Sequence, residues 1–244
     1  HVFCESPLAL DLHQAQQMRD AARRAGRLLQ VGLLMRSVSA YAHVEAAMRS
    51  GEHGRLLSVT AWRLGSYLHA DAPDRKAHHG DPSTELMTFD FDFVHWLMGQ
   101  PRILSAGAAR TPDGRPGEVS ALLGYPNGRQ ATVIASGLMP PGSPFTVGFR
   151  ALFERAAFEH LATFAGGPPK TSLTVAAGKT AARPVPLAER NPFEVELQRF
   201  VDCIRGRADP ALLDADRAIE ALLLSLAAQR SLAEQRPIDC FTSA

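Results

Sequence analysis

Residues 1–34 read HVFCESPLALDLHQAQQMRDAARRAGRLLQVGLL and contain two short apolar runs on either side of an amphipathic segment. The first run is Val2–Cys4 and the second is Leu28–Leu34. Between them, Asp11 is placed to cap a helix that stops at Gly26. A strand, a helix and another strand within so short a stretch predict a βαβ unit, in which the two strands are parallel.

Parallel sheets are normally covered on both faces, and one βαβ unit cannot do this alone. We therefore interpret residues 1–35 as the C-terminal remnant of a larger Rossmann-type domain whose earlier strands are not in this chain. The chain also opens on His1 rather than on Met. We expect the natural N-terminus to lie upstream, so no signal peptide can be judged from this sequence.

Residues 36–244 predict a second, α+β domain. Short β-like runs separated by turn signals such as Pro126-Asn127-Gly128 predict a mixed, mostly antiparallel, open-faced sheet. Helices are expected on one face of this sheet, at Ser39–Ser50, Ser83–Met98, Pro192–Arg205 and Asp214–Glu234. The order of the elements gives the fold class α+β, with a parallel remnant in front.

The composition excludes several classes of protein. With 244 residues, of which 45% are hydrophobic, the chain can bury a sizeable core and is not intrinsically disordered. A formal net charge of +1 gives no electrostatic reason to expect nucleic acid as a partner. No apolar run reaches the roughly 18 residues of a membrane span, so no membrane is expected either.

The three cysteines, Cys4, Cys203 and Cys240, are far apart and show neither a disulfide framework nor the spacing of a zinc site. We expect free thiols in a reducing compartment, the cytoplasm, and no bound metal.

Three motifs in order resemble the glucose–fructose oxidoreductase/inositol dehydrogenase family, Gfo/Idh/MocA. Residues 1–8, HVFCESPL, are similar to the family's HVxCEKPLA, and a later QVG follows its helix. The segment 51–56, GEHGRL, is similar to the family's lead-in to a strand. Residues 85–92, ELMTFDFD, followed by WLMG, resemble the family's DLGxHxxD and its helix end. The resemblance covers essentially the whole chain.

The resemblance implies an NAD(P)-dependent oxidoreductase that acts on a sugar, inositol or related polyol. In the family, a lysine at the carboxyl end of a parallel strand lies beside the nicotinamide ribose, and an aspartate and a histidine four residues later, both on one helix, complete the proton relay. The glycine-rich turn that binds the pyrophosphate belongs to the first βαβ unit. No G-x-G-x-x-G occurs in this sequence, so we expect the chain by itself to bind NAD or NADP poorly.

All three relay positions depart from the family pattern. The lysine falls on Ser6, the aspartate on Glu85 and the histidine on Phe89. Glu85 keeps a carboxylate, whereas neither Ser6 nor Phe89 can exchange a proton at neutral pH. Each residue also has a structural explanation: Ser6 as the end of a strand, Glu85 as a helix N-terminal acid, and Phe89 as part of a core stripe.

Other residues are candidates for the missing roles. We expect the cofactor to contact Glu5, Ser6, Pro7 and Arg36, although an arginine at the start of a helix is equally explained as solvated. Arg63, Tyr67 and Phe89 are candidate substrate contacts, and Glu85 and His79 are the candidate catalytic residues. His79 is included because a histidine titrates near neutral pH and its loop borders the substrate in the family.

Two functions remain open on these observations. The first is a polyol or sugar oxidoreductase with a replaced relay; the second is a catalytically inactive relative that serves as a sugar-binding or scaffold protein. In either case we expect a homodimer or homotetramer formed through the open face of the sheet.

Overall fold

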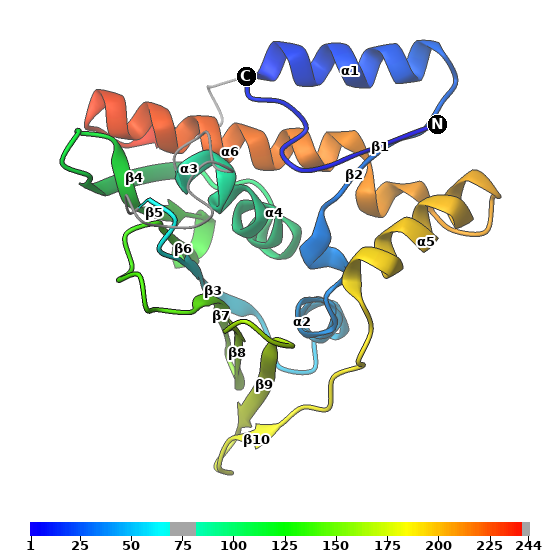
Figure 1. The fold of residues 1–244 in the computed structure, drawn as a ribbon. Helices are drawn as coiled ribbons and strands as arrows, with labels where there is room; N and C mark the ends of the chain where they lie inside the picture. The colour runs from blue at the N-terminus through cyan, green and yellow to red at the C-terminus, as the bar shows by residue number, and fades with distance from the viewer. Residues whose placement is uncertain (69–81, 241–244) are drawn as a thin grey trace.

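The computed structural model describes residues 1–68 and 82–240 and contains two β-sheets (Figure 1). One is a two-stranded parallel sheet, and the other is a nine-stranded mixed sheet in the order β10-β9-β8-β7-β3-β6-β5-β4-β11. The predicted α+β class, with a parallel remnant followed by a mostly antiparallel sheet, is therefore confirmed.

The N-terminal unit consists of β1 (Val2–Cys4), α1 (Leu12–Arg24) and β2 (Leu29–Val31). Val2 pairs with Leu29 and Cys4 with Val31, in parallel register. The side chain of Asp11 accepts a hydrogen bond from the amide of Gln14 at 2.8 Å, as expected of the helix cap. The second strand is shorter than predicted, because the chain turns after Val31 and enters the 3-10 helix η1 (Leu34–Ser37).

The large sheet mixes both strand directions at its centre. β3 (Leu56–Leu64) pairs in parallel with β6 (Gln130–Ser136) on one side and antiparallel with β7 (Phe145–Phe153) on the other. The remaining strands are antiparallel to their neighbours: β4 (Ile103–Arg110), β5 (Pro116–Gly124), β8 (Ala156–Phe164), β9 (Lys170–Ala177), β10 (Arg183–Pro184) and β11 (Ile238–Asp239). The 3-10 turn η3 (Pro126–Gly128) joins β5 to β6.

Helices α2 (Ser39–Ser50), α4 (Met87–Met98) and α6 (Ala215–Glu234) pack on one face of this sheet (Figure 1). The helix expected over Ser83–Met98 is interrupted at Leu86, which divides it into α3 (Pro82–Glu85) and α4. Helix α5 (Pro192–Ile204) lies beside the N-terminal unit, and η4 (Pro210–Leu213) leads into α6. The first half of α6 completes the core of the N-terminal unit, where Leu222 packs with Val31 and Leu33.

The other face of the large sheet carries no helix among the described residues. Trp62 packs closely against Gly148 there, since a Cβ at residue 148 would come within 2.4 Å of the Trp62 ring. Leu122, Leu152 and Leu161 are respectively 49%, 41% and 43% exposed. This open face is the surface that the sequence analysis expected to carry an oligomer contact.

Candidate active site

The carboxyl ends of β1 and β2 carry the residues expected to contact a cofactor. Glu5, Ser6 and Pro7 follow β1 directly, and the Ser6–Pro7 peptide bond is cis. The Glu5 side chain is exposed and reaches across to Gly32 after β2, where a Cβ would lie 2.8 Å from Oε2 of Glu5. Because Gly32 has no side chain, the Glu5 carboxylate can lie against the backbone at this edge. Doubly wound sheets bind their ligands at the carboxyl ends of such strands.

Arg36 lies on η1, and its guanidinium is buried and hydrogen-bonded to other parts of the protein. Its Nε and Nη2 donate to both carboxylate oxygens of Asp92 on α4, at 2.7–3.2 Å. Its Nη1 donates to the carbonyl oxygen of Leu212 at 3.0 Å, and the group lies 5.2 Å from the centre of the Trp96 ring. Arg36 therefore joins η1 to α4 and η4, so a cofactor contact would compete with these partners. Burial raises the pKa of Asp92, and Arg36 opposes that rise.

Arg63 forms a second buried ion pair, which joins the large sheet to α4. It projects from β3, and its Nε and Nη2 donate to the two carboxylate oxygens of Asp90 at 3.0 and 3.2 Å. Its guanidinium lies 4.8 Å from the centre of the Phe89 ring. Burial raises the pKa of Asp90 to about 6 against the attraction of Arg63, so the pair is ionised at neutral pH. Asp90 and Asp92 thus bind different arginines and do not face each other, because residues two apart on a helix point in different directions.

Aromatic residues surround the Arg63–Asp90 pair. The Tyr41 ring packs edge-on against Phe149 and His160, and burial raises the pKa of Tyr41. The Tyr41 hydroxyl is buried and makes no hydrogen bond with the described residues. The Nδ1 of His160 donates to the carbonyl oxygen of Ser172 at 2.7 Å, and burial lowers the pKa of this ring. His160 is therefore neutral at neutral pH and belongs to the core.

The other expected site residues come from α3, from α4 and from the segment after β3. Glu85 is the last residue of α3 and is partly buried. Tyr67 follows β3 and is 4% exposed. Phe89 is partly buried against the main core and contacts Arg63. His79 lies outside the described residues. The structure thus brings Arg63 and Phe89 together, while Ser6 remains at the edge of the strand pair.

The described residues offer few groups that could exchange a proton with a substrate at α4. Phe89 has no proton to give, and both arginines are ion-paired with aspartates. Because each arginine is paired, this region adds no net charge that would select an anionic substrate. Arg63 Nη1 takes no part in the ion pair with Asp90, and an arginine nitrogen donates readily to a hydroxyl oxygen.

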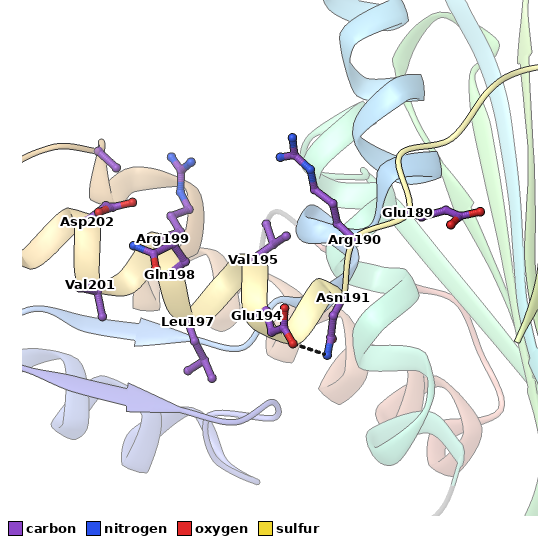
Figure 2. Close-up of a pocket in the computed structure, with 11 residues that line it drawn as sticks. Glu189, Arg190, Asn191, Glu194, Val195, Leu197, Gln198, Arg199, Val201 and Asp202 are labelled. Carbon is purple, nitrogen blue, oxygen red and sulfur yellow. Dashed lines mark hydrogen bonds between the residues drawn. The ribbon is translucent and has the colours of Figure 1, made fainter. Parts of the chain in front are cut away.

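A separate groove follows α5 and the segment before it. Its volume is about 840 Å³, and Figure 2 shows Arg190 and Arg199 on one side and Leu197 and Val201 on the other. Asn191 caps the helix here, and its Nδ2 donates to Oε1 of Glu194 at 3.3 Å. The lining includes none of the expected site residues, so we do not assign the substrate to this groove.

Known proteins similar to this chain place it in a family. The domain described as GFO/IDH/MocA C-terminal domain matches residues 41–159. Myo-inositol dehydrogenase Hyg17 of Streptomyces leeuwenhoekii is 30% identical over 240 residues, which cover 94% of this chain and 70% of that protein. The chain belongs to the Gfo/Idh/MocA family of oxidoreductases.

A second relative and a solved structure are also similar to this chain. The scyllo-inositol 2-dehydrogenase (NAD(+)) of Bacillus subtilis is 25% identical to this Gfo/Idh/MocA chain, over 97% of the chain and 70% of that protein. The solved structure of aldose-aldose oxidoreductase from Caulobacter crescentus shares the fold, with a TM-score of 0.80 at 19% identity, covering 98% of this chain and 72% of that one.

Within the described residues, no helix has the length and apolar character needed to cross a bilayer.

Several residues around the site escaped the sequence analysis. Tyr41 was not singled out, and the ion pairs that Asp90 and Asp92 form with Arg63 and Arg36 were not expected. The alternation along β3 places Arg63 on the inward face and so implies a buried partner. Glu196 was also missed. It lies four residues before Phe200 and seven before Cys203, on the inner face of α5. A glutamate at helical spacing on an apolar face is the signal that could have identified it.

Proposed function

We propose that the protein carrying this chain is an NAD(P)-dependent oxidoreductase that acts on inositol or on a related polyol or sugar. The observation that carries the proposal is the similarity to inositol dehydrogenases. The myo-inositol dehydrogenase Hyg17 is 30% identical to this chain over an alignment that covers 94% of the chain. The paired arginines support a neutral substrate, because Arg36 and Arg63 each meet a buried aspartate.

The cofactor is proposed as NAD or NADP. The edge after β1 fits part of it: the Glu5 carboxylate and the Ser6 hydroxyl are polar groups at the carboxyl ends of parallel strands, where a nicotinamide ribose would be held. Pro7 fixes the chain direction behind them, and Arg36 stays a candidate contact. When bound, the nicotinamide supplies the acceptor or donor of a hydride.

For the substrate, we propose contacts from Arg63, Tyr67 and Phe89. Arg63 donates hydrogen bonds from a position fixed by Asp90, and Phe89 offers an apolar ring to the carbon face of a polyol. Glu85 orients a hydroxyl through its carboxylate. The lysine and histidine of the family relay are replaced by Ser6 and Phe89, and His79 is the proposed stand-in from the preceding loop.

We also propose a division into residues 1–35, the end of a dinucleotide-binding domain, and residues 36–244, the substrate and oligomer domain. The parallel β1–β2 pair and the exposed apolar side chains Phe193, Leu197 and Val201 on α5 support an additional domain beside this edge. The chain spans about 70% of the length of its inositol dehydrogenase relatives. The core of the first unit is shared with α6, so the two parts are not independent.

Assembly is proposed as a homodimer or homotetramer through the open sheet face. The exposed Leu122, Leu152 and Leu161 support it, because monomers seldom leave a sheet face this apolar. We propose the cytoplasm as the compartment, in keeping with three free cysteines.

A second function has one specific observation in its favour. Phe89, at the position of the family histidine, packs against the core and Arg63. A catalytically inactive sugar-binding or scaffold protein would have this arrangement.

A panel of inositols, aldoses and their lactones, offered with each nicotinamide nucleotide in both directions, tests the proposal by the absorbance of reduced nicotinamide. Turnover of an inositol or aldose supports the oxidoreductase. Calorimetric binding of a polyol with no turnover under any condition supports the sugar-binding alternative.

A further inference from the structure

Three polar contacts join the α3–α4 segment to α6. As the partner on α3–α4 moves toward the C-terminus, the partner on α6 moves toward the N-terminus, so the two segments run antiparallel. The distances between the contacting atoms are 2.5, 2.9 and 3.2 Å in the order of the α3–α4 partner. We call this set the interhelix contacts, and its members are Thr84–Gln229, Thr88–Ser225 and His95–Glu220.

The first two interhelix contacts fix how α3 and α4 lie against α6. Gln229 Nε2 donates to Thr84 Oγ1, and the hydroxyls of Thr88 and Ser225 bond to each other. Thr84, Thr88 and Ser225 are buried, and a buried hydroxyl that loses its partner costs free energy. The partners are four residues apart on both segments, which is about one helical turn. A slip of one turn would therefore leave at least one of the hydroxyls without its partner.

The residue after each of the two threonines belongs to the proposed substrate site. Glu85 follows Thr84 on α3, and Phe89 follows Thr88 on α4. Neighbouring residues on a helix point about 100° apart. Thr88 accordingly bonds to α6, while Phe89 lies against Arg63 of β3. The directions in which the two site side chains point thus depend on how the interhelix contacts orient α3 and α4.

Helix α3 needs such outside contacts more than α4 does. It has only four residues, Pro82–Glu85, and the helix is interrupted after it at Leu86. A single helical turn has little stability of its own. The amide of Leu86 donates to the carbonyl oxygen of Pro82 at 3.2 Å, and Gln229 holds Thr84 within the same turn. The bond from Gln229 therefore helps to keep α3 formed.

Helix α6 also supports the edge where the cofactor is proposed to bind. Its residues Ile219 and Leu222 belong to the same core as Val31 of β2 and Leu33. One helix thus underlies both the cofactor edge and, through the interhelix contacts, the substrate residues. Hydride transfer needs the reacting atoms about 3–3.5 Å apart, and a misplacement of about 1 Å can cost about 10²-fold in rate.

We propose that Gln229 and Ser225 are positioning residues, which act through Thr84 and Thr88 on the substrate residue that follows each threonine. Helix α6 thereby sets the distance between the bound substrate and the nicotinamide. The inference rests on the proposed oxidoreductase function, because the alignment matters only if a hydride passes between the two.

The first test follows hydrogen exchange of the Leu86 amide in the protein that carries this chain. Thr84→Val removes the acceptor of the Gln229 bond and should speed this exchange by about tenfold, the usual effect of one hydrogen bond. Thr84→Ser keeps the acceptor and should retain most of the protection. Arg230→Ala removes a surface ion pair on α6 and is the control, with no change expected. Unchanged exchange in Thr84→Val overturns the proposal, whatever the activity.

The second test separates positioning from stability by steady-state kinetics. Thr88→Val combined with Ser225→Ala replaces both hydroxyls by apolar groups, so neither is left buried without a partner, and urea unfolding should stay near wild type. We expect kcat on a polyol to fall by about 10-fold or more, while KM for the nicotinamide nucleotide is unchanged, since the cofactor edge is intact. Thr88→Ser keeps the hydroxyl and should retain kcat.

The kinetic outcomes distinguish the inference from the function on which it rests. A double variant with the kcat of wild type, or one in which KM for the nucleotide rises as kcat falls, would make the interhelix contacts purely structural and overturn the proposal. A wild type that turns over no substrate refutes the proposed function and the alignment that depends on it. The Leu86 exchange then still decides whether α6 holds α3.

Discussion

The guanidinium of Arg63 lies 4.8 Å from the centre of the Phe89 ring. We propose that Phe89 stands where the family carries a histidine, and Arg63 on β3 lies over its ring. Arg63 is held there by Asp90 on the next position of α4. The local arrangement is thus a hydrogen-bond donor, held in place by Asp90, beside an apolar ring.

The first prediction concerns the stability that the Arg63–Asp90 pair gives the fold. Asp90→Asn leaves the Arg63 charge buried without its counter-ion and should lower the free energy of unfolding by about 3–5 kcal/mol. Replacing both residues by apolar ones, as in Arg63→Met with Asp90→Leu, should cost less than either single change. Urea unfolding at pH 7 measures both effects.

The control for this prediction is Arg49→Ala. Arg49 pairs with Glu45 on the surface at 3.7 Å, and its side chain is 74% exposed, so its loss should hardly change the unfolding midpoint. An Asp90→Asn protein as stable as Arg49→Ala would show that the buried pair does not hold α4 to β3.

The second prediction concerns the proposed replacement of the family relay by Ser6 and Phe89. Introducing Ser6→Lys together with Phe89→His in the protein that carries this chain should raise turnover of a polyol by about 10²-fold or more, since a positioned acid or base typically contributes that much. Phe89→Leu keeps an apolar side chain there and serves as the control, with no gain expected. Rapid wild-type turnover that the double change reduces would argue that the present site is already complete.

The third prediction is a dependence of stability on pH through Glu196. Its pKa is raised to about 7 in the folded protein, by burial first and Glu5 second, from an ordinary value of 4.5. Between these two values the folded protein binds more protons than the unfolded chain. The contribution of Glu196 to stability is therefore complete below about pH 4.5 and is lost as the pH rises through about 7.

Glu196→Gln removes this dependence, so the variant should gain in unfolding free energy relative to wild type when the pH is raised from 5 to 8. The unfolding free energy of Glu194→Gln should differ from that of wild type by the same amount at pH 5 and at pH 8. Parallel curves for wild type and Glu196→Gln over this range would mean that Glu196 is ionised throughout.

Local features of the fold could be predicted from the sequence, because they depend on neighbours along the chain. The cap at Asp11 and the left-handed end of α2 at Gly51 are examples, and both are found. The parallel pair of strands at the start of the chain was also predicted, although β2 is shorter than expected, and β8 (Ala156–Phe164) was not predicted. The interruption at Leu86 was missed, since Ser83–Met98 has continuous helical periodicity.

The long-range features could not be predicted in the same way. β3 and β6 are parallel neighbours, although α3, α4, β4 and β5 lie between them in the sequence. The role of Arg36 depends on Asp92 and Leu212, which are 56 and 176 residues away in sequence. Such partners are set by how the helices pack on the sheet, and a single sequence does not specify them.

The fourth prediction concerns the packing of Trp62 on the open sheet face. A Cβ at Gly148 would lie 2.4 Å from the Trp62 ring and 2.8 Å from the carbonyl oxygen of His160. Gly148→Ala should therefore force the ring away and destabilise the protein by about 1–3 kcal/mol. Gly107→Ala in β4 is the matched control, because nothing lies within 4 Å of its added Cβ. Equal midpoints of thermal unfolding for the two variants would contradict the close packing.

The last prediction concerns assembly through the same face. Leu152 and Leu161 are 41% and 43% exposed on adjacent strands, β7 and β8. If this face joins two copies, a carboxylate at either position must be buried without a partner at the contact, which costs several kcal/mol per copy. Leu152→Asp and Leu161→Asp should each shift the mass measured by light scattering toward the monomer. Leu10→Asp, at a leucine that is 70% exposed away from the large sheet, should leave the mass unchanged. A wild-type protein that is already monomeric at micromolar concentration would refute assembly through this face, and a dimer that survives both substitutions would assign the contact to another surface.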